Sequence, residues 1–195
     1  MNKPNNYDAT QVAGDFTPIE AGGHLCVINQ VEEVTDKNGK AMLKISLDTD
    51  TTDKQPSYFA ESFKNDIRPD KKWGCVLYIG IDESTDYGVK NLKTFCTSVE
   101  ESNTGFSVQW GDKFAECFKN KKVGVVFGRE QYLNNKGEVK WSTKPKWFRS
   151  TGTVLNAKVP DDKYLPTGSA PIAGTPSSDG FMNIPDGIDE ELPFN

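Results

Sequence analysis

Apolar and polar residues alternate most regularly from residue 42 to residue 49. This period of two is typical of a strand with one buried face. Residues 24–34 start with a stretch that is apolar on both faces, which is typical of a central strand. Between them, Asp36–Gly39 contains an Asn-Gly pair, which favours the positive φ angles of a tight turn. These segments predict a first β-hairpin.

The spacing of apolar residues changes between residues 89 and 103. Leu92, Phe95, Cys96 and Val99 recur at three- and four-residue intervals, which predicts a helix ending near Asn103. Residues 50–72 are polar and interrupted by prolines, and they predict no regular element. The remaining predictions are strands over 73–81, 123–132 and 138–154, a bend at Pro145, a helical turn over 114–118 and a hairpin turn at Asn134–Gly137.

The order is three strands, a helix and two strands. This order favours a mainly β protein, a five-stranded OB-type Greek-key barrel with one helix between strands 3 and 4. An open α+β sheet uses the same elements and stays an alternative.

The composition divides the chain into four parts. Beyond Pro160, Pro, Gly, Ser, Thr and Ala dominate, which is typical of a flexible linker. The sequence therefore predicts an N-terminal arm over 1–15, the barrel domain over 16–158, the linker over 159–185 and an acidic, disordered tip over 186–195.

Several classes of protein are disfavoured. No apolar run approaches the roughly 20 residues of a membrane helix, and residues 1–15 lack the pattern of a secretory signal. We therefore expect a cytoplasmic protein. No Gly-rich phosphate loop is present, His24 is the single histidine, and the cysteines lie far apart without a Cys-x-x-Cys pair. We expect no metal, no cofactor and no enzymatic activity, with reduced structural thiols at Cys26, Cys75, Cys96 and Cys117.

Charge is distributed unevenly along the chain. The net charge is −5, but residues 113–149 contain ten basic and three acidic side chains. Residues 1–112 contain 11 basic and 18 acidic ones, and residues 150–195 contain two and seven. Because phosphates respond to a local patch, the basic segment is compatible with nucleic-acid binding despite the acidic total.

The chain ends with acidic residues followed by Leu-Pro-Phe. A tail of this kind is suited to docking its aromatic ring in a partner's pocket while its carboxylates meet a basic rim. The ending resembles the C-terminal tip of bacterial single-stranded DNA-binding proteins, except that Asn195 follows the phenylalanine. The resemblance implies recruitment of replication and recombination proteins through Asp189, Glu190, Glu191, Leu192, Pro193 and Phe194.

A second resemblance covers residues 16–156. Its segments are Gly22-Gly23, Glu100–Asn103, Val125–Glu130, Asn135–Glu138 and the Lys-rich fifth strand. They are similar to a family of single-stranded DNA-binding proteins encoded by phages and prophages. That resemblance implies an OB-fold and a non-enzymatic role in phage replication and recombination.

The residues also indicate a binding surface independently of any family. Sequence-tolerant binding of single strands needs cations for phosphates and aromatic rings for bases. Lys140, Lys144 and Lys146 share one parity, so they predict a phosphate track if Pro145 does not shift the register. Trp141 and Trp147 have the other parity, and each is as compatible with the core as with DNA. The candidates on the last two strands are Arg129, Tyr132, Lys136, Lys140, Trp141, Lys144, Lys146, Trp147 and Arg149. A second group comprises Tyr58, Phe59, Phe63, Lys64 and Trp73.

The expected function is therefore sequence-tolerant binding of single-stranded DNA, with partner proteins recruited by the tip. One alternative is an adaptor barrel that binds protein and not DNA. A less favoured one is a magnesium-dependent nuclease, because neighbouring carboxylates such as Glu32-Glu33, Asp82-Glu83 and Glu100-Glu101 face opposite ways on a strand. The sequence does not fix the oligomeric state, and a homo-oligomer is compatible with it.

Overall fold

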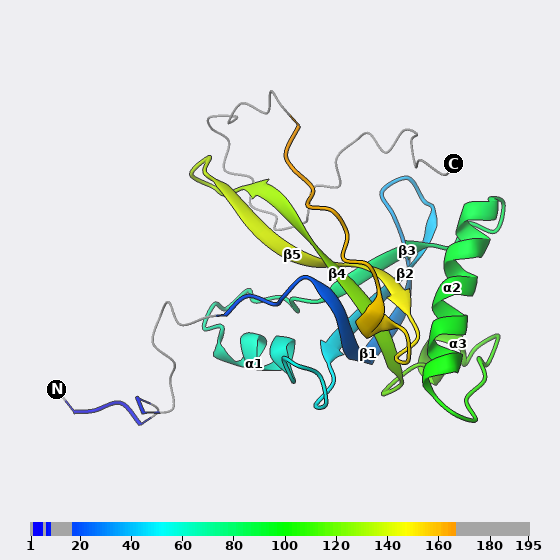
Figure 1. The fold of residues 1–195 in the computed structure, drawn as a ribbon, viewed down its shortest axis with the longest axis horizontal. Coiled ribbons are helices and arrows are strands. Elements are labelled where there is room, and N and C mark those ends of the chain that lie inside the picture. Colours follow the sequence, from blue (N-terminus) through cyan, green and yellow to red (C-terminus); the bar gives the residue numbers. More distant parts are fainter. Residues whose placement is uncertain (1, 6, 9–16, 167–195) are drawn as a thin grey trace.

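The computed structural model describes residues 2–5, 7–8 and 17–166 (Figure 1). A curved sheet forms the centre of the protein, and helices lie on two sides of the sheet. In chain order the elements are β1 (Gly22–Thr35), β2 (Ala41–Thr49), α1 (Tyr58–Asn65), β3 (Val76–Gly80), α2 (Asp86–Ser102), α3 (Phe114–Cys117), β4 (Lys122–Leu133), β5 (Val139–Arg149) and the 3₁₀-helix η1 (Val154–Asn156).

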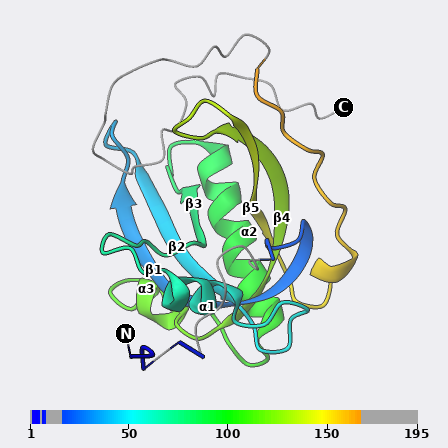
Figure 2. The ribbon, with the colours of Figure 1, turned by 90° about the vertical axis from the view of Figure 1, so that its left-hand side faces the viewer.

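The five strands form one antiparallel sheet in the order β3-β2-β1-β4-β5. Closure into a barrel is not found, because within the described residues no ladder of hydrogen bonds joins β3 to β5. Instead α2 packs against β3, β4 and β5, and Figure 2 shows it between the two sides of the curved sheet. Proline at position 145 is tolerated because β5 is an edge strand.

The core lies on the concave face of the sheet. Leu43, Ile45 and Leu47 of β2 are fully buried there, as their alternation predicts. From α2, Phe95 contacts Phe118 and Phe148 with ring centroids 4.7 and 4.9 Å apart. The contact with Phe148 holds α2 against β5, and the contact with Phe118 joins it to the end of α3. Both predicted patterns, the period of two on β2 and the helical spacing on α2, are confirmed.

Three predictions of local structure are wrong. Residues 50–72 contain α1, whose Phe59 is buried and lies 6.0 Å from Phe127, ring centroid to ring centroid. The third strand starts at Val76 instead of residue 73. The fifth strand ends at Arg149 instead of residue 154, because the chain turns and η1 begins at Val154.

The segment after β5 crosses the convex face of the sheet. It packs closely on two glycines, since a Cβ atom at Gly23 would lie 1.9 Å from the carbonyl oxygen of Val154, and one at Gly124 would lie 2.5 Å from Val154 Cβ. Farther on, Lys163 forms a parallel bridge with Glu130 of β4. Residues 159–166, which the composition assigns to the linker, are therefore packed against the sheet.

None of the helices in the described part of the chain is long and apolar enough to cross a membrane.

Candidate nucleic-acid interface

The β4–β5 hairpin extends beyond the rest of the sheet (Figure 1). β1 pairs with β4 only as far as Phe127, so the later residues of β4 have β5 on one side and no strand of the sheet on the other. The turn is held by Asn134, whose Oδ1 accepts hydrogen bonds from the backbone N–H groups of Lys136 and Glu138, both at 2.9 Å. The predicted turn, Asn134–Gly137, is thus stabilised by its own first residue.

A bulge at Lys146 changes which side chains share a face. Phe127 pairs with Pro145 and Val126 pairs with Trp147, so Lys146 has no Cα partner between them. Because one extra residue inverts the alternation along β5, Trp147 lies on the same face as Lys144. The prediction that both tryptophans face away from the lysines therefore holds for Trp141 and is wrong for Trp147.

The outer face of the hairpin contains the lysines. Glu130 of β4 lies between two of them, with Oε2 2.6 Å from Lys146 Nζ and Oε1 3.6 Å from Lys144 Nζ. Burial opposes the ionisation of Glu130, but the hydrogen bond and charge of Lys146, together with Lys144 and Lys163, lower its pKa. At the tip, Lys140 is 3.2 Å from Glu138. The lysine track is therefore partly neutralised by its own carboxylates.

Two aromatic side chains share this outer face. Tyr132 pairs with Lys140, and Trp147 lies beyond Lys144 in the register. Their exposed fractions are 45% and 38%. Exposed rings beside lysines are the combination that lets a surface stack bases and neutralise phosphates together.

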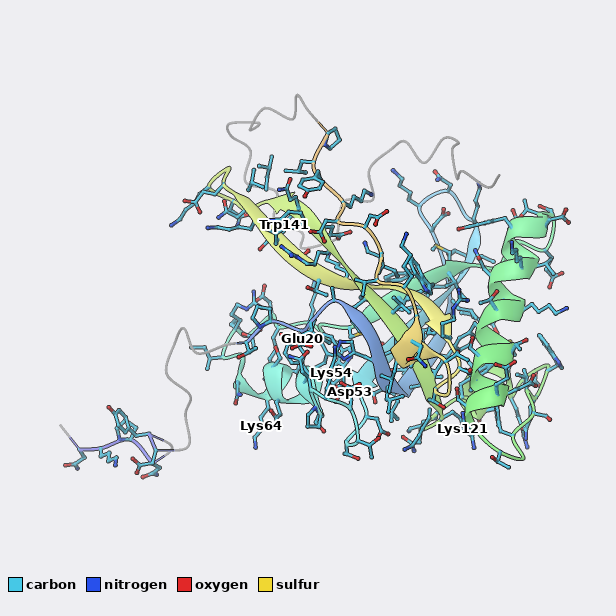
Figure 3. All side chains as sticks on the ribbon, in the orientation of Figure 1. Glu20, Asp53, Lys54, Lys64, Lys121 and Trp141 are labelled. Carbon is cyan, nitrogen blue, oxygen red and sulfur yellow. The ribbon has the colours of Figure 1, made fainter. Side chains whose placement is uncertain are left out.

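The inner face contains the other pair. The guanidinium of Arg129 lies 4.6 Å from the centre of the Trp141 ring, within the range of a cation–π interaction. Trp141 is 37% exposed, and Figure 3 shows it on the hairpin, away from Lys64 on α1. The hairpin thus has a cation and an aromatic side chain on each of its faces.

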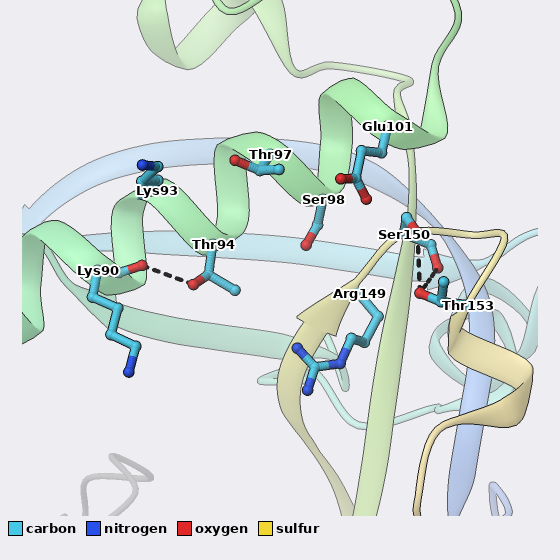
Figure 4. Close-up of a pocket in the computed structure, with 9 residues that line it drawn as sticks. All are labelled: Lys90, Lys93, Thr94, Thr97, Ser98, Glu101, Arg149, Ser150 and Thr153. Atoms are coloured by element: carbon cyan, nitrogen blue, oxygen red, sulfur yellow. Dashed lines mark hydrogen bonds between the residues drawn. The ribbon is translucent and has the colours of Figure 1, made fainter.

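Arg149 lies at the far end of β5 and lines a cleft between this strand and α2 (Figure 4). The cleft has a volume of about 340 Å³. Within residues 17–166, neither Arg149 nor Lys93 has an ion-pair partner. The cleft is lined by Lys90, Lys93, Thr94, Thr97, Ser98, Glu101, Arg149, Ser150 and Thr153. The sequence analysis does not predict the basic side chains of α2 as binding residues, because α2 precedes the basic segment 113–149 in the chain.

The second predicted group does not join the hairpin surface. Phe59 is a core residue, and Trp73 donates its indole N–H to the carbonyl oxygen of Leu47 at 2.7 Å. The hydroxyl of Tyr58 accepts a hydrogen bond from the backbone of Ile19 at 3.0 Å. Phe63 lies 5.6 Å from Trp73 and is covered by the ammonium of Lys71. These aromatics fix α1 to the sheet, and the exposed side chain of Lys64 is the member with the freest approach to solvent.

The cysteines are free thiols. Burial raises the pKa of Cys26 and Cys75 well above the usual range, and it raises the pKa of Cys96 to about 12. These thiols therefore stay protonated and unreactive at neutral pH. Among the described residues, no three histidine, cysteine, aspartate or glutamate side chains are grouped so that they could hold a metal ion.

In comparisons with known proteins, neither a protein-family model nor a curated protein matches this chain. The predicted acidic tip, residues 186–195, and the arm over 1–15, apart from residues 2–5 and 7–8, lie outside the described residues.

Proposed function

We propose that this chain binds single-stranded DNA without strong sequence preference, with the β4–β5 hairpin as its main contact surface. The observation that carries the proposal is the outer face of the hairpin. There Lys140, Lys144 and Lys146 lie beside the exposed rings of Tyr132 and Trp147. No catalytic step is part of the proposal.

This combination suits a single strand better than a duplex. An unpaired base offers its face to an aromatic ring, whereas a base in a duplex is already stacked on its neighbours. Each stacked base contributes about 1–3 kcal/mol, largely independent of its identity. The lysines neutralise phosphates, so affinity falls with salt as counterions are released, with a logarithmic slope of about 0.7 per phosphate contact.

The arrangement of the sheet supports an OB-type fold in its partly open form. The strand order β3-β2-β1-β4-β5, with α2 between β3 and β4 in the chain, is compatible with that fold. OB-type proteins bind oligonucleotides with one sheet face and with the loops of two hairpins. The loop between β4 and β5 is one of these loops in our proposal.

The role we propose in the cell is phage or prophage DNA replication and recombination. It rests on the resemblance over residues 16–156 and on the acidic ending of the sequence, Asp189–Phe194. In this proposal the tip recruits replication or recombination proteins while the hairpin holds the DNA.

The test is a titration of the full chain with fluorescently labelled oligo-dT, followed by anisotropy and by tryptophan quenching. Trp147→Ala and Tyr132→Ala, both on the outer face, are compared with Trp110→Ala. The control is matched, because Trp110 is 68% exposed but stacks on Phe114 at 5.2 Å instead of lying on the hairpin. We expect saturable binding that is much weaker for duplex and fades with salt. The two hairpin variants should lose about five- to a hundredfold in affinity, as expected for the loss of one stacked base.

Other results would contradict the proposal. If oligo-dT does not bind at low salt, DNA binding is excluded and the adaptor alternative becomes the leading explanation. If binding is unchanged in both hairpin variants and lost in Trp110→Ala, the interface lies near α3 instead of the hairpin.

A further inference from the structure

Residues 161–165, called the strap below, run along the edge of β4 that β1 leaves uncovered. The backbone N–H of Lys163 donates to the carbonyl oxygen of Arg129 at 3.0 Å, and the N–H of Gln131 donates to the carbonyl oxygen of Lys163 at 2.9 Å. The backbone N–H of Leu165 donates to Oε1 of Gln131 at 3.2 Å. The strap is therefore aligned in register with β4.

This register places two strap side chains on the inner face of the hairpin. Asp162 Oδ2 lies 3.6 Å from Nη1 of Arg129. The ring of Tyr164 lies 5.3 Å from the ring of Trp141, at an angle of 80°. A carboxylate thus meets the guanidinium while an aromatic ring meets the indole. A nucleotide would make the same two contacts, its phosphate with the guanidinium and its base with the indole.

We propose that the strap is a built-in competitor for a nucleotide subsite formed by Arg129 and Trp141. The proposal rests on the proposed function and adds regulation to it. With the strap in place, DNA binds only to the outer face of the hairpin. When the strap leaves, the inner face accepts one further nucleotide of a single strand.

The contacts of the strap are weak enough to be displaced. The exposed fraction of Tyr164 is 65%, and the side chains of Arg129 and Asp162 are 45% and 32% exposed. An exposed ion pair of this kind contributes little to stability in water. The strap follows the part of β4 that β1 leaves unpaired, so its release breaks backbone hydrogen bonds without opening the core.

The first experiment opens the strap in the full chain. A double variant, Asp162→Asn with Tyr164→Ala, is titrated with labelled oligo-dT. Its affinity is compared with that of the single variant Asp161→Asn. The control is matched, since Asp161 is exposed, lies next to Asp162 in the chain and makes no ion pair within the described residues. We expect the double variant to bind about three- to tenfold tighter than the natural chain, given the usual strength of such contacts. The control should change affinity by less than twofold, about the effect of one solvent-screened surface charge.

The second experiment closes the strap. Glu130→Cys and Lys163→Cys place two thiols at the bridged positions, so oxidation ties the strap to β4. The oxidised protein should bind oligo-dT more weakly than the same sample after reduction. Comparing one sample before and after reduction removes the effect of losing the charges of Glu130 and Lys163.

The outcomes separate the two proposals. If the natural chain binds oligo-dT while the opened variant matches Asp161→Asn and the oxidised form matches the reduced one, the strap proposal is overturned and the proposed function stands. If neither the natural chain nor the opened variant binds oligo-dT, both are overturned.

Discussion

Nδ1 of His24 lies 2.9 Å from Oδ1 of Asp53, and neither side chain is exposed to solvent. The other ring nitrogen of His24 lies 3.1 Å from the carbonyl oxygen of Glu20, which can only accept a hydrogen bond. A hydrogen on either ring nitrogen therefore has an acceptor within reach. Asp53 Oδ2 also accepts the backbone N–H of Leu25 at 2.7 Å. The pair therefore connects the start of β1 to the loop after β2.

Asp53→Asn should destabilise the fold by about 3–5 kcal/mol, because it leaves a buried histidine without its charged partner. Urea unfolding followed by circular dichroism measures this loss. Asp112→Asn, at an exposed carboxylate, should change the free energy of unfolding by no more than about 0.5 kcal/mol. Equal effects of the two substitutions would mean that the buried pair is energetically neutral.

The same pair makes stability depend on pH in the acid range. Burial opposes ionisation of Asp53, but hydrogen bonds from His24 and from the backbone of Gln55 and Leu25 outweigh it and lower the pKa below 3.8. A carboxyl whose pKa is lowered in the folded state stabilises the fold above its unfolded pKa. That contribution is lost as the pH falls through the folded value. The unfolding free energy of the natural chain should drop below pH 3.8 more steeply than that of Asp53→Asn.

Gly23→Ala should destabilise the protein by about 1–3 kcal/mol or more, because the new methyl group would collide with the backbone of Val154. The chain supplies its own control in Gly80, where an added Cβ atom meets nothing within 4 Å. Thermal unfolding of Gly23→Ala and Gly80→Ala compares them. If Gly23→Ala is as stable as Gly80→Ala, the segment after β5 can move away from residue 23 at little cost in stability.

Glu130→Gln should strengthen binding to oligo-dT by about two- to fivefold, because it releases Lys144 and Lys146 from their ion pairs. The salt dependence should also become steeper, since the two ammonium groups then release counterions only from DNA. Glu116→Gln makes the same change of charge on α3. If both variants tighten binding equally, the effect comes from the change in net charge and not from the release of Lys144 and Lys146.

Arg149→Gln tests whether DNA reaches the cleft between β5 and α2. If a phosphate binds there, the slope of log affinity against log salt should fall by about 0.7. Lys37→Gln, in the distant turn after β1, is the control. An unchanged slope for Arg149→Gln would mean that the DNA contact surface does not extend past Trp147 into the cleft.

Local patterns predicted the parts of the fold that depend on neighbouring residues. The alternation at Leu43, Ile45 and Leu47 identified β2, and the spacing of Phe95 and Val99 identified α2. The sequence does not predict α1 because its aromatic residues, Tyr58, Phe59 and Phe63, form a short signal inside a polar segment.

The candidate site was predicted in composition but not in arrangement. The concentration of cations and aromatics in residues 113–149 follows from the sequence alone, because charge and residue type are properties of single residues. The folded structure was needed to show that a bulge at Lys146 turns Trp147 toward the lysines. It alone placed Glu130 between two lysines and set Asp162 and Tyr164 against Arg129 and Trp141. Strand register and packing depend on residues that are far apart in the sequence, and the local spacing of apolar residues does not indicate which of them come into contact.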